Sequence, residues 1–299
     1  MQQNEITIGA DPEVFILDEN KNIASAIGVI GGTKLNPKPT DYGYVQEDNV
    51  LAEFNVRPAN NGTDFVQNNI LAYRNLEDIV TEQGYMIAEG ISYYQYSEDE
   101  AKVYLNNDQA QTFGCDPDIN AWTCEYNENV SAQALAEHIR VAGGHIHIGM
   151  PSQYQHPMFS VNLARLCDVF IGAPLYLFAP EEYKIQELKR RNFYGQFGSF
   201  REKPYGIEYR APSNSWLGST NLMSFVFEAS SRAAEIVGRY NAEAEQEIDR
   251  FDNLKAIQTM SECLEFEDTS PLKRHIEHIC DKYDLPRITH GTFGSIFND

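Results

Sequence analysis

Four short segments of this chain alternate polar with apolar residues, and this alternation constrains the fold more than any other feature. Successive side chains of a β-strand point to opposite faces, so residues two apart share a face. Each segment therefore predicts a strand with one polar and one apolar face. Taken alone, such a polar stripe is usually the solvent-facing side of a half-buried strand. The segments are Asp11-Pro12-Glu13, Glu53-Phe54-Asn55-Val56-Arg57, His145-Ile146-His147 and Glu208-Tyr209-Arg210.

The remaining elements mix strands and helices without a regular alternation. Apolar spacing predicts one helix with Thr63 as its N-cap and Gly84 as its end. This mixture favours an α+β fold with a largely antiparallel sheet, built as one domain of residues 1–299. The other expected elements are an N-terminal hairpin, a β-rich stretch at 85–96, a loop region at 105–129, helices near 157–173, 219–246 and 270–284, and hence a mainly helical part at 218–299.

Charge, cysteine content and hydropathy narrow the classes of function. The 44 acidic and 23 basic residues give a net charge of -21, which opposes contact with nucleic acid or an anionic membrane. The five cysteines form no CxxC pair, so neither a disulfide framework nor a thiolate zinc site is indicated. No apolar run approaches the roughly 18 residues that span a bilayer, and the N-terminus lacks signal-peptide features. We expect a cytoplasmic protein without nucleic-acid or membrane partners.

The polar stripes carry carboxylates, imidazoles and guanidinium groups, which together suggest metal and phosphate chemistry. Carboxylates gathered on one sheet face are costly unless cations compensate them. Oxygen ligands with one nitrogen suit Mg²⁺ or Mn²⁺ better than zinc. Arginines at 190–201 and at Arg210 are suited to clamping phosphate oxygens. The motifs GxxxxGK[ST], GxSxG and HExxH are missing, which disfavours a P-loop, a hydrolase elbow and a zincin.

Six motifs, in this order, resemble the carboxylate–amine ligases of glutamine synthetase-like fold, and most closely the phage-type (phiEco32-like) COOH–NH2 ligase type 2 group. The resemblance implies a curved sheet with flanking helices, ATP and Mg²⁺ or Mn²⁺ as cofactors, and amide formation through an acyl phosphate. If the gene is carried by a phage, the compartment is the host cytoplasm. The motifs are GADPEVF at 9–15, LAEFNVRPA at 51–59, GCDPDINAW at 114–122, GGHIHIG at 143–149, RRNFYGQFGSFR at 190–201 and YGIEYRAPSNSWL at 205–217.

The resemblance also assigns metal ligands. Asp11 and Glu13 occupy the place of the family's first acidic motif, and Glu53 that of the second. His145 matches the histidine ligand, and Glu208 matches the last metal carboxylate. The chain has Asp-Pro-Glu where Glu-x-Glu is usual, so the number of metal ions stays open.

Nucleotide and substrate roles follow from the same resemblance. Arg201 and Arg210 match arginines that contact phosphate or the acyl phosphate and, with Glu53, are the catalytic candidates. His147 and Arg191 are expected on the nucleotide side. Because they alternate with apolar residues after Glu53, Asn55 and Arg57 are candidates for orienting the substrate carboxylate.

Two other functions fit the same residues. A metal-dependent phosphotransferase on this fold would stop at a phosphorylated product. A non-catalytic nucleotide-binding or inhibitory phage protein would form no product. For the ligase, the partners are a small-molecule or peptide carboxylate and an amine, whose identities the sequence does not specify.

Overall fold

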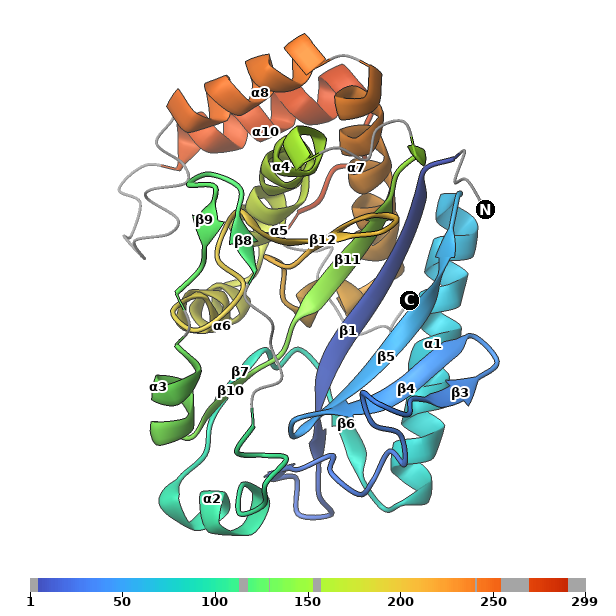
Figure 1. Ribbon diagram of the computed structural model, residues 1–299, viewed down its shortest axis with the longest axis vertical. Coiled ribbons are helices and arrows are strands. Elements are labelled where there is room, and N and C mark those ends of the chain that lie inside the picture. The colour runs from blue at the N-terminus through green and yellow to red at the C-terminus, as the bar shows by residue number, and fades with distance from the viewer. Residues whose placement is uncertain are drawn as a thin grey trace.

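The computed structural model describes residues 5–112, 118–128, 130–152, 157–239, 241–253 and 269–289. In this part of the chain one antiparallel sheet runs in the order β3-β4-β5-β1-β11-β13-β12-β8-β9, while β2 and β6 pair with the end of β1 (Figure 1). Strands β7 and β10 form a separate pair. The strands are β1 Thr7–Leu17, β2 Ile23–Ala24, β3 Lys38–Thr40, β4 Gly43–Asp48, β5 Leu51–Ala59, β6 Met86–Ala88, β7 Tyr93–Gln95, β8 Ile119–Asn120, β9 Glu125–Tyr126, β10 Ile139–Val141, β11 Gly144–Gly149, β12 Ser199–Lys203 and β13 Gly206–Tyr209. The predicted α+β class, antiparallel sheet and N-terminal hairpin are confirmed.

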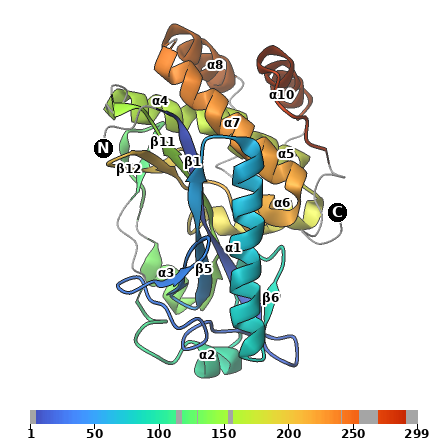
Figure 2. The same cartoon turned by 90° about the vertical axis from the view of Figure 1, so that its right-hand side faces the viewer.

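Helices α1 and α7 lie side by side on one face of the sheet (Figure 2). Helix α4 packs against α7 and against β12 and β13. The α-helices are α1 Gly62–Glu82, α2 Glu98–Tyr104, α3 Ser131–Ala136, α4 Pro157–Cys167, α5 Ala173–Phe178, α6 Glu181–Arg191, α7 Thr220–Arg239, α8 Asn241–Asn253 and α10 Ser270–Tyr283. A π-helical turn, Asp168–Gly172, joins α4 to α5, and a 3₁₀ turn covers Asn214–Gly218. The predicted helical C-terminal part is thus seen in its described residues.

The alternation in the strands sorts their side chains between the two faces of the sheet. Ala10, Phe54 and Ile146 belong to the main apolar core and are at most 2% exposed. Their polar neighbours lie on the opposite face, away from α1 and α7. The strand registers then place polar residues of neighbouring strands side by side: Asp11 with His145, Glu13 with Glu53, His147 with Glu208, and Arg201 with Glu208.

Helix α1 begins two residues earlier than the sequence pattern suggested. The N-cap is Asn61 in an extended conformation, and its side chain accepts a hydrogen bond from the Asp64 N–H. The prediction of Thr63 as the N-cap was wrong. The helix already begins at Gly62, and the Asn61 side chain pairs one of the free amides of its first turn. The end of the helix was predicted correctly, since Gly84 has a φ of +83° that favours glycine.

The stretch Met158–Phe178 is long and apolar enough to cross a membrane, although no such stretch was predicted from the sequence. However, 78% of its apolar window is buried inside the protein, as expected for a core helix. At its centre, Asp168 accepts hydrogen bonds from Trp122 Nε1 and the Tyr209 hydroxyl at 2.5 and 2.7 Å. Burial raises the pKa of Asp168 to about 6 despite these bonds. The helix predicted at 157–173 therefore continues, through a π-helical turn, to residue 178.

Candidate metal centre

Asp11, His145 and Glu208 form the first of two acidic clusters on the polar face of the sheet. Each offers one ligand atom within 4.8 Å of the other two. His145 Nδ1 lies 3.5 Å from Asp11 Oδ1 and 3.9 Å from Glu208 Oε1. All three were predicted as metal ligands, and the antiparallel pairing of β1, β11 and β13 brings them together.

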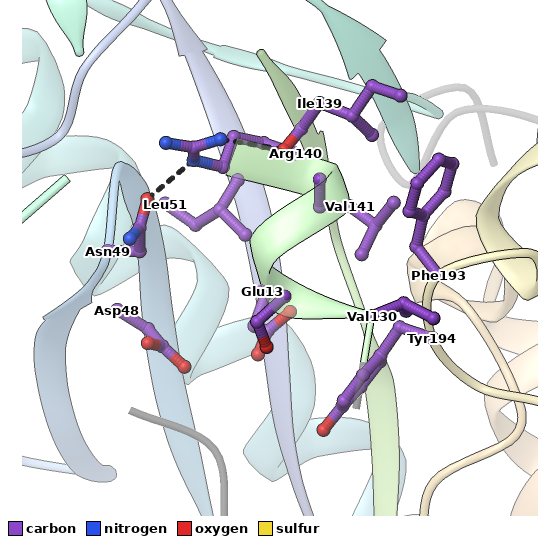
Figure 3. A pocket seen from close by; sticks show the side chains of 12 residues that line it. Glu13, Asp48, Asn49, Leu51, Val130, Ile139, Arg140, Val141, Phe193 and Tyr194 are labelled. Atoms are coloured by element: carbon purple, nitrogen blue, oxygen red, sulfur yellow. Dashed lines mark hydrogen bonds between the residues drawn. The ribbon is translucent and has the colours of Figure 1, made fainter. Parts of the chain in front are cut away.

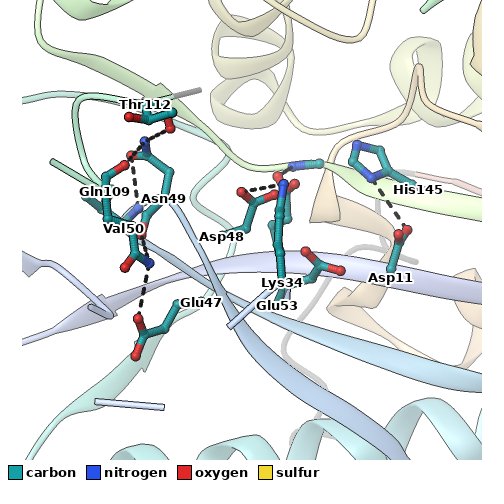
Figure 4. A network of polar contacts seen from close by, with 12 residues as sticks. Asp11, Lys34, Glu47, Asp48, Asn49, Val50, Glu53, Gln109, Thr112 and His145 are labelled. Carbon is teal, nitrogen blue, oxygen red and sulfur yellow. Dashed lines mark hydrogen bonds and ion pairs between the residues drawn. The ribbon is translucent and has the colours of Figure 1, made fainter. Parts of the chain in front are cut away.

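The second cluster contains Glu13, Asp48 and Glu53, again with ligand atoms within 4.8 Å of one another. Figure 4 shows Asp48 and Glu53 beside Lys34, whose Nζ lies 2.8 Å from Asp48 Oδ1. Asp48 was not predicted. A signal was present, because Asp48-Asn49 is a turn sequence and Asn49 has a φ of +56°. That tight turn folds Asp48 back beside β5, where it faces Glu53.

The second cluster is electrostatically costly without a bound cation. Burial and the charge of Asp48 raise the pKa of Glu13 to about 8. Burial, followed by the charges of Asp11 and Asp48, raises the pKa of Glu53 well above its usual value. A divalent cation would favour the charged carboxylates, and three oxygen ligands suit Mg²⁺ or Mn²⁺. The donor set therefore fits the predicted metal.

The first cluster contains an imidazole that is neutral at physiological pH. Burial, aided by the positive charge of Arg210, lowers the pKa of His145 to about 3. A neutral imidazole is the form that binds metals, and Nδ1 is the nitrogen that faces the carboxylates. Burial tends to raise the pKa of Asp11, but the charges and hydrogen bonds of His147, 2.9 Å away, and of His145 together outweigh it, and the net shift is downward.

Positively charged side chains surround Glu208. Arg210 forms a short ion pair with it, and Arg201 Nη1 lies 3.7 Å from Glu208 Oε1. Lys203 Nζ lies 2.6 Å from the other oxygen, although the sequence analysis did not single it out. Its signal was the two-residue spacing from Arg201 on the same strand. This group of cations is placed for phosphate oxygens next to the first cluster.

Arg191 does not join this group. It ends helix α6, is 5% exposed, and its guanidinium stacks over Phe197 at 4.0 Å and Tyr176 at 4.8 Å. Its ion pair is with Glu187 at 3.7 Å. Because α6 turns the side chain into an aromatic layer, the structure shows a packing role for Arg191, and its contact with a nucleotide stays a prediction.

Asn55 and Arg57, the two candidate substrate ligands, have different positions. Asn55 donates a hydrogen bond to Glu53 Oε1 at 2.8 Å and so stays with the clusters. The register between β1 and β5 shifts between the pairs Ala10–Val56 and Ile8–Ala59, so Arg57 lies within a β-bulge near the end of β5. Arg57 is exposed, and within the described residues its side chain has no ion pair with either cluster. Its role in orienting the substrate carboxylate stays a prediction.

A cavity of about 350 Å³ opens beside Asp11, Asn55 and His147. Gly9 and Gly149 line it without side chains, and Tyr205 closes one side with its hydroxyl bonded to His147 Nδ1. His147 was predicted on the nucleotide side, and its position in this cavity is compatible with that role. Tyr205 was missed because its loop lies outside the alternating strands.

Residues 121–257 match the family described as Phage phiEco32-like COOH.NH2 ligase-type 2. The resemblance inferred from the motifs is confirmed. The match supports a carboxylate–amine ligase type of function. It includes the histidine strand, the arginine segment and Glu208, while the strands that carry Asp11, Glu13 and Glu53 precede it.

Similar solved structures include two ligase-related proteins at low identity. A bifunctional glutathione synthetase from Pasteurella multocida is 12% identical, with a TM-score of 0.39, over 94% of this chain and 47% of that one. The chain thus spans about half of that protein's length. A novel glutamine synthase homolog is 11% identical, with a TM-score of 0.38, over 92% of this chain and 68% of that one. No curated protein matched the chain. With similarities this distant, the fold class rests on the strand order and registers described above.

Proposed function

We propose that this protein is an ATP-dependent carboxylate–amine ligase that requires Mg²⁺ or Mn²⁺ and forms an amide through an acyl phosphate. The observation that carries the proposal is the pair of buried carboxylate clusters beside Arg201, Lys203 and Arg210. Buried anions next to guanidinium and ammonium groups suit a divalent metal–phosphate complex, and the match to a ligase family supports the reaction type.

Asp11, His145 and Glu208 would hold one metal ion, and Glu13, Asp48 and Glu53 a second. A bound divalent cation supplies charge neutralisation for the triphosphate and its leaving group. The arginines and Lys203 contact the transferring phosphoryl oxygens. The cavity at His147 and Tyr205 receives the nucleoside, since it adjoins the first cluster.

In the first step a substrate carboxylate oxygen bonds to the γ-phosphorus of ATP, and the bond from that phosphorus to the β-phosphate bridging oxygen breaks, releasing ADP. In the second, the amine nitrogen attacks the acyl carbon and the carbon–oxygen bond to phosphate breaks. The amine loses one proton. Glu53 is the candidate acceptor, because it is a carboxylate of the cluster where the two substrates would meet.

The test compares Glu208→Gln and His145→Ala with Glu202→Gln, an exposed carboxylate on the neighbouring strand. The first two should reduce Mg²⁺-dependent ADP formation at least about 100-fold, because each removes a metal ligand. Circular dichroism should show all three folded. Full activity in both cluster variants would refute the site. A stable phosphorylated product would instead favour the phosphotransferase, and a flat calorimetric trace with Mg²⁺ and ATP would favour the non-catalytic protein.

A further inference from the structure

A second pocket, of about 80 Å³, is lined by Glu13 and Asp48 of the second cluster (Figure 3). It shares no lining residue with the cavity at His147. Its walls come from strands β5 and β10, helix α3 and the loop after α6. Half of the twelve residues that line it are apolar: Leu51, Val130, Ala134, Ile139, Val141 and Phe193. The pocket therefore offers a hydrophobic surface directly beside buried carboxylates.

Arg140, the positively charged residue among those that line the pocket, already forms hydrogen bonds within the protein. Arg140 is 1% exposed, and its guanidinium donates to Asn49 Oδ1 at 2.8 Å, to the Ile139 carbonyl at 2.7 Å and to the Ala110 carbonyl at 2.7 Å. An acidic side chain placed among Leu51, Val141 and Phe193 would find, among the described lining residues, no cation that is not already bonded. The pocket thus disfavours an acidic occupant.

The size of the pocket narrows its occupant further. An apolar cavity of about 150 Å³ accepts a benzene ring. At about 80 Å³, this pocket suits a smaller group such as a branched aliphatic side chain. Tyr194 lines the pocket, and its buried hydroxyl has no hydrogen-bond partner among the described residues. The hydroxyl points away from Phe193, so it is placed for the polar backbone of an occupant whose side chain fills the apolar end (Figure 3).

We infer that one of the two groups joined by this protein carries an uncharged, branched aliphatic side chain of valine or leucine size, which binds in the Leu51–Val141–Phe193 pocket. This inference rests on the proposed ligase function. It makes the substrate a hydrophobic amino acid or a peptide ending in one, rather than an acidic one.

The selectivity assay uses Mg²⁺, ATP and an equimolar mixture of glycine, valine, leucine, glutamate and lysine, because amino acids supply both carboxyl and amine groups. Amide products are counted by mass spectrometry. Ala134→Leu fills the pocket from α3, and Ala136→Leu adds the same side chain at an exposed position of that helix. One methylene in a hydrophobic pocket changes selectivity about 10- to 200-fold. Ala134→Leu should therefore lower the use of leucine relative to glycine at least about tenfold, while Ala136→Leu should match the wild type.

A binding measurement separates this inference from the ligase proposal. Isovalerate, which has the leucine-like isobutyl group, is titrated against methyl-labelled protein and compared with glutarate. Isovalerate alone should shift the methyl signals of Leu51, Ile139 and Val141, and Ala134→Leu should abolish the shifts. Equal shifts with glutarate, no shifts with isovalerate, or preferred use of glutamate or lysine would overturn the inference. Isovalerate binding without any ADP or amide would support the pocket and count against the ligase.

Discussion

Glu13→Gln is the most informative single change in the metal centre. Glu13 is 7% exposed, and its Oε2 accepts a hydrogen bond from the Gly143 N–H at 2.6 Å. The glutamine amide oxygen can accept the same bond with little change in volume. The substitution therefore removes the titration of Glu13 and its capacity as a metal ligand while preserving local packing.

The expected effect on stability follows from proton linkage. The pKa of Glu13 is raised from 4.5 to about 8 in the folded protein, chiefly by burial. Between these values the folded state holds a proton that the unfolded state has lost, so metal-free stability falls as the pH rises. One such group changes the free energy of unfolding by up to about 1.4 kcal/mol per pH unit, or on the order of 5 kcal/mol across this window. Glu53 contributes with the same sign in both proteins.

Urea unfolding from pH 5 to pH 8 in EDTA measures this slope directly. The free energy of unfolding of the wild type should fall with rising pH. The slope for Glu13→Gln should be shallower by about 1.4 kcal/mol per pH unit, the contribution of one proton. Added Mg²⁺ should stabilise the wild type increasingly up to pH 8, because the metal competes with the proton, and should have a much smaller effect on the variant. Equal slopes in the two proteins, or a wild type that gains stability with pH in EDTA, would show that this electrostatic reasoning is wrong.

Three further substitutions test neighbouring parts of the site. Arg191→Ala should lower the free energy of unfolding by about 3 kcal/mol in urea melts, since the guanidinium is buried over Phe197. It should leave the KM for Mg²⁺-ATP unchanged, and a raised KM would support its predicted nucleotide contact. Gly143→Ala would place its Cβ 2.2 Å from His145 Nε2, so calorimetry should show Mg²⁺ affinity reduced at least about tenfold, and wild-type affinity would disprove the contact. Lys34→Met should move the onset of Mg²⁺ stabilisation to higher pH in thermal melts, because the Lys34 charge lowers the pKa of Glu13, whereas a shift to lower pH would contradict that coupling.

The residues whose positions the sequence predicted correctly are those on regular strands. Glu13, Glu53 and His145 alternate with core residues, so a strand assignment alone places them on the polar face. That these strands bring their polar side chains to one site could then be inferred, because buried charged groups are stable only beside groups that compensate their charge. Their grouping into two separate clusters could not, because it depends on which strands pair and in what register.

The residues whose positions the sequence did not predict lie where the backbone leaves that regular pattern. Arg57 lies in a β-bulge, and Arg191 ends a helix that was not predicted. Asp48 reaches the centre through a tight turn, and Tyr205 through the loop between β12 and β13. In each case side-chain direction is set by a local irregularity or by tertiary packing, neither of which periodicity encodes. The part of the GCDPDINAW motif at 114–117 lies outside the described residues.

Product analysis tests the central proposal most directly. The protein is incubated with Mg²⁺, ATP and a metabolite extract whose carboxylates carry ¹⁸O, and the products are followed by mass spectrometry. The ligase mechanism predicts ADP, a new species with the summed mass of two metabolites minus water, and one ¹⁸O in the released phosphate. ADP formed with unlabelled phosphate and no such adduct, or a stable phosphorylated metabolite, would contradict it.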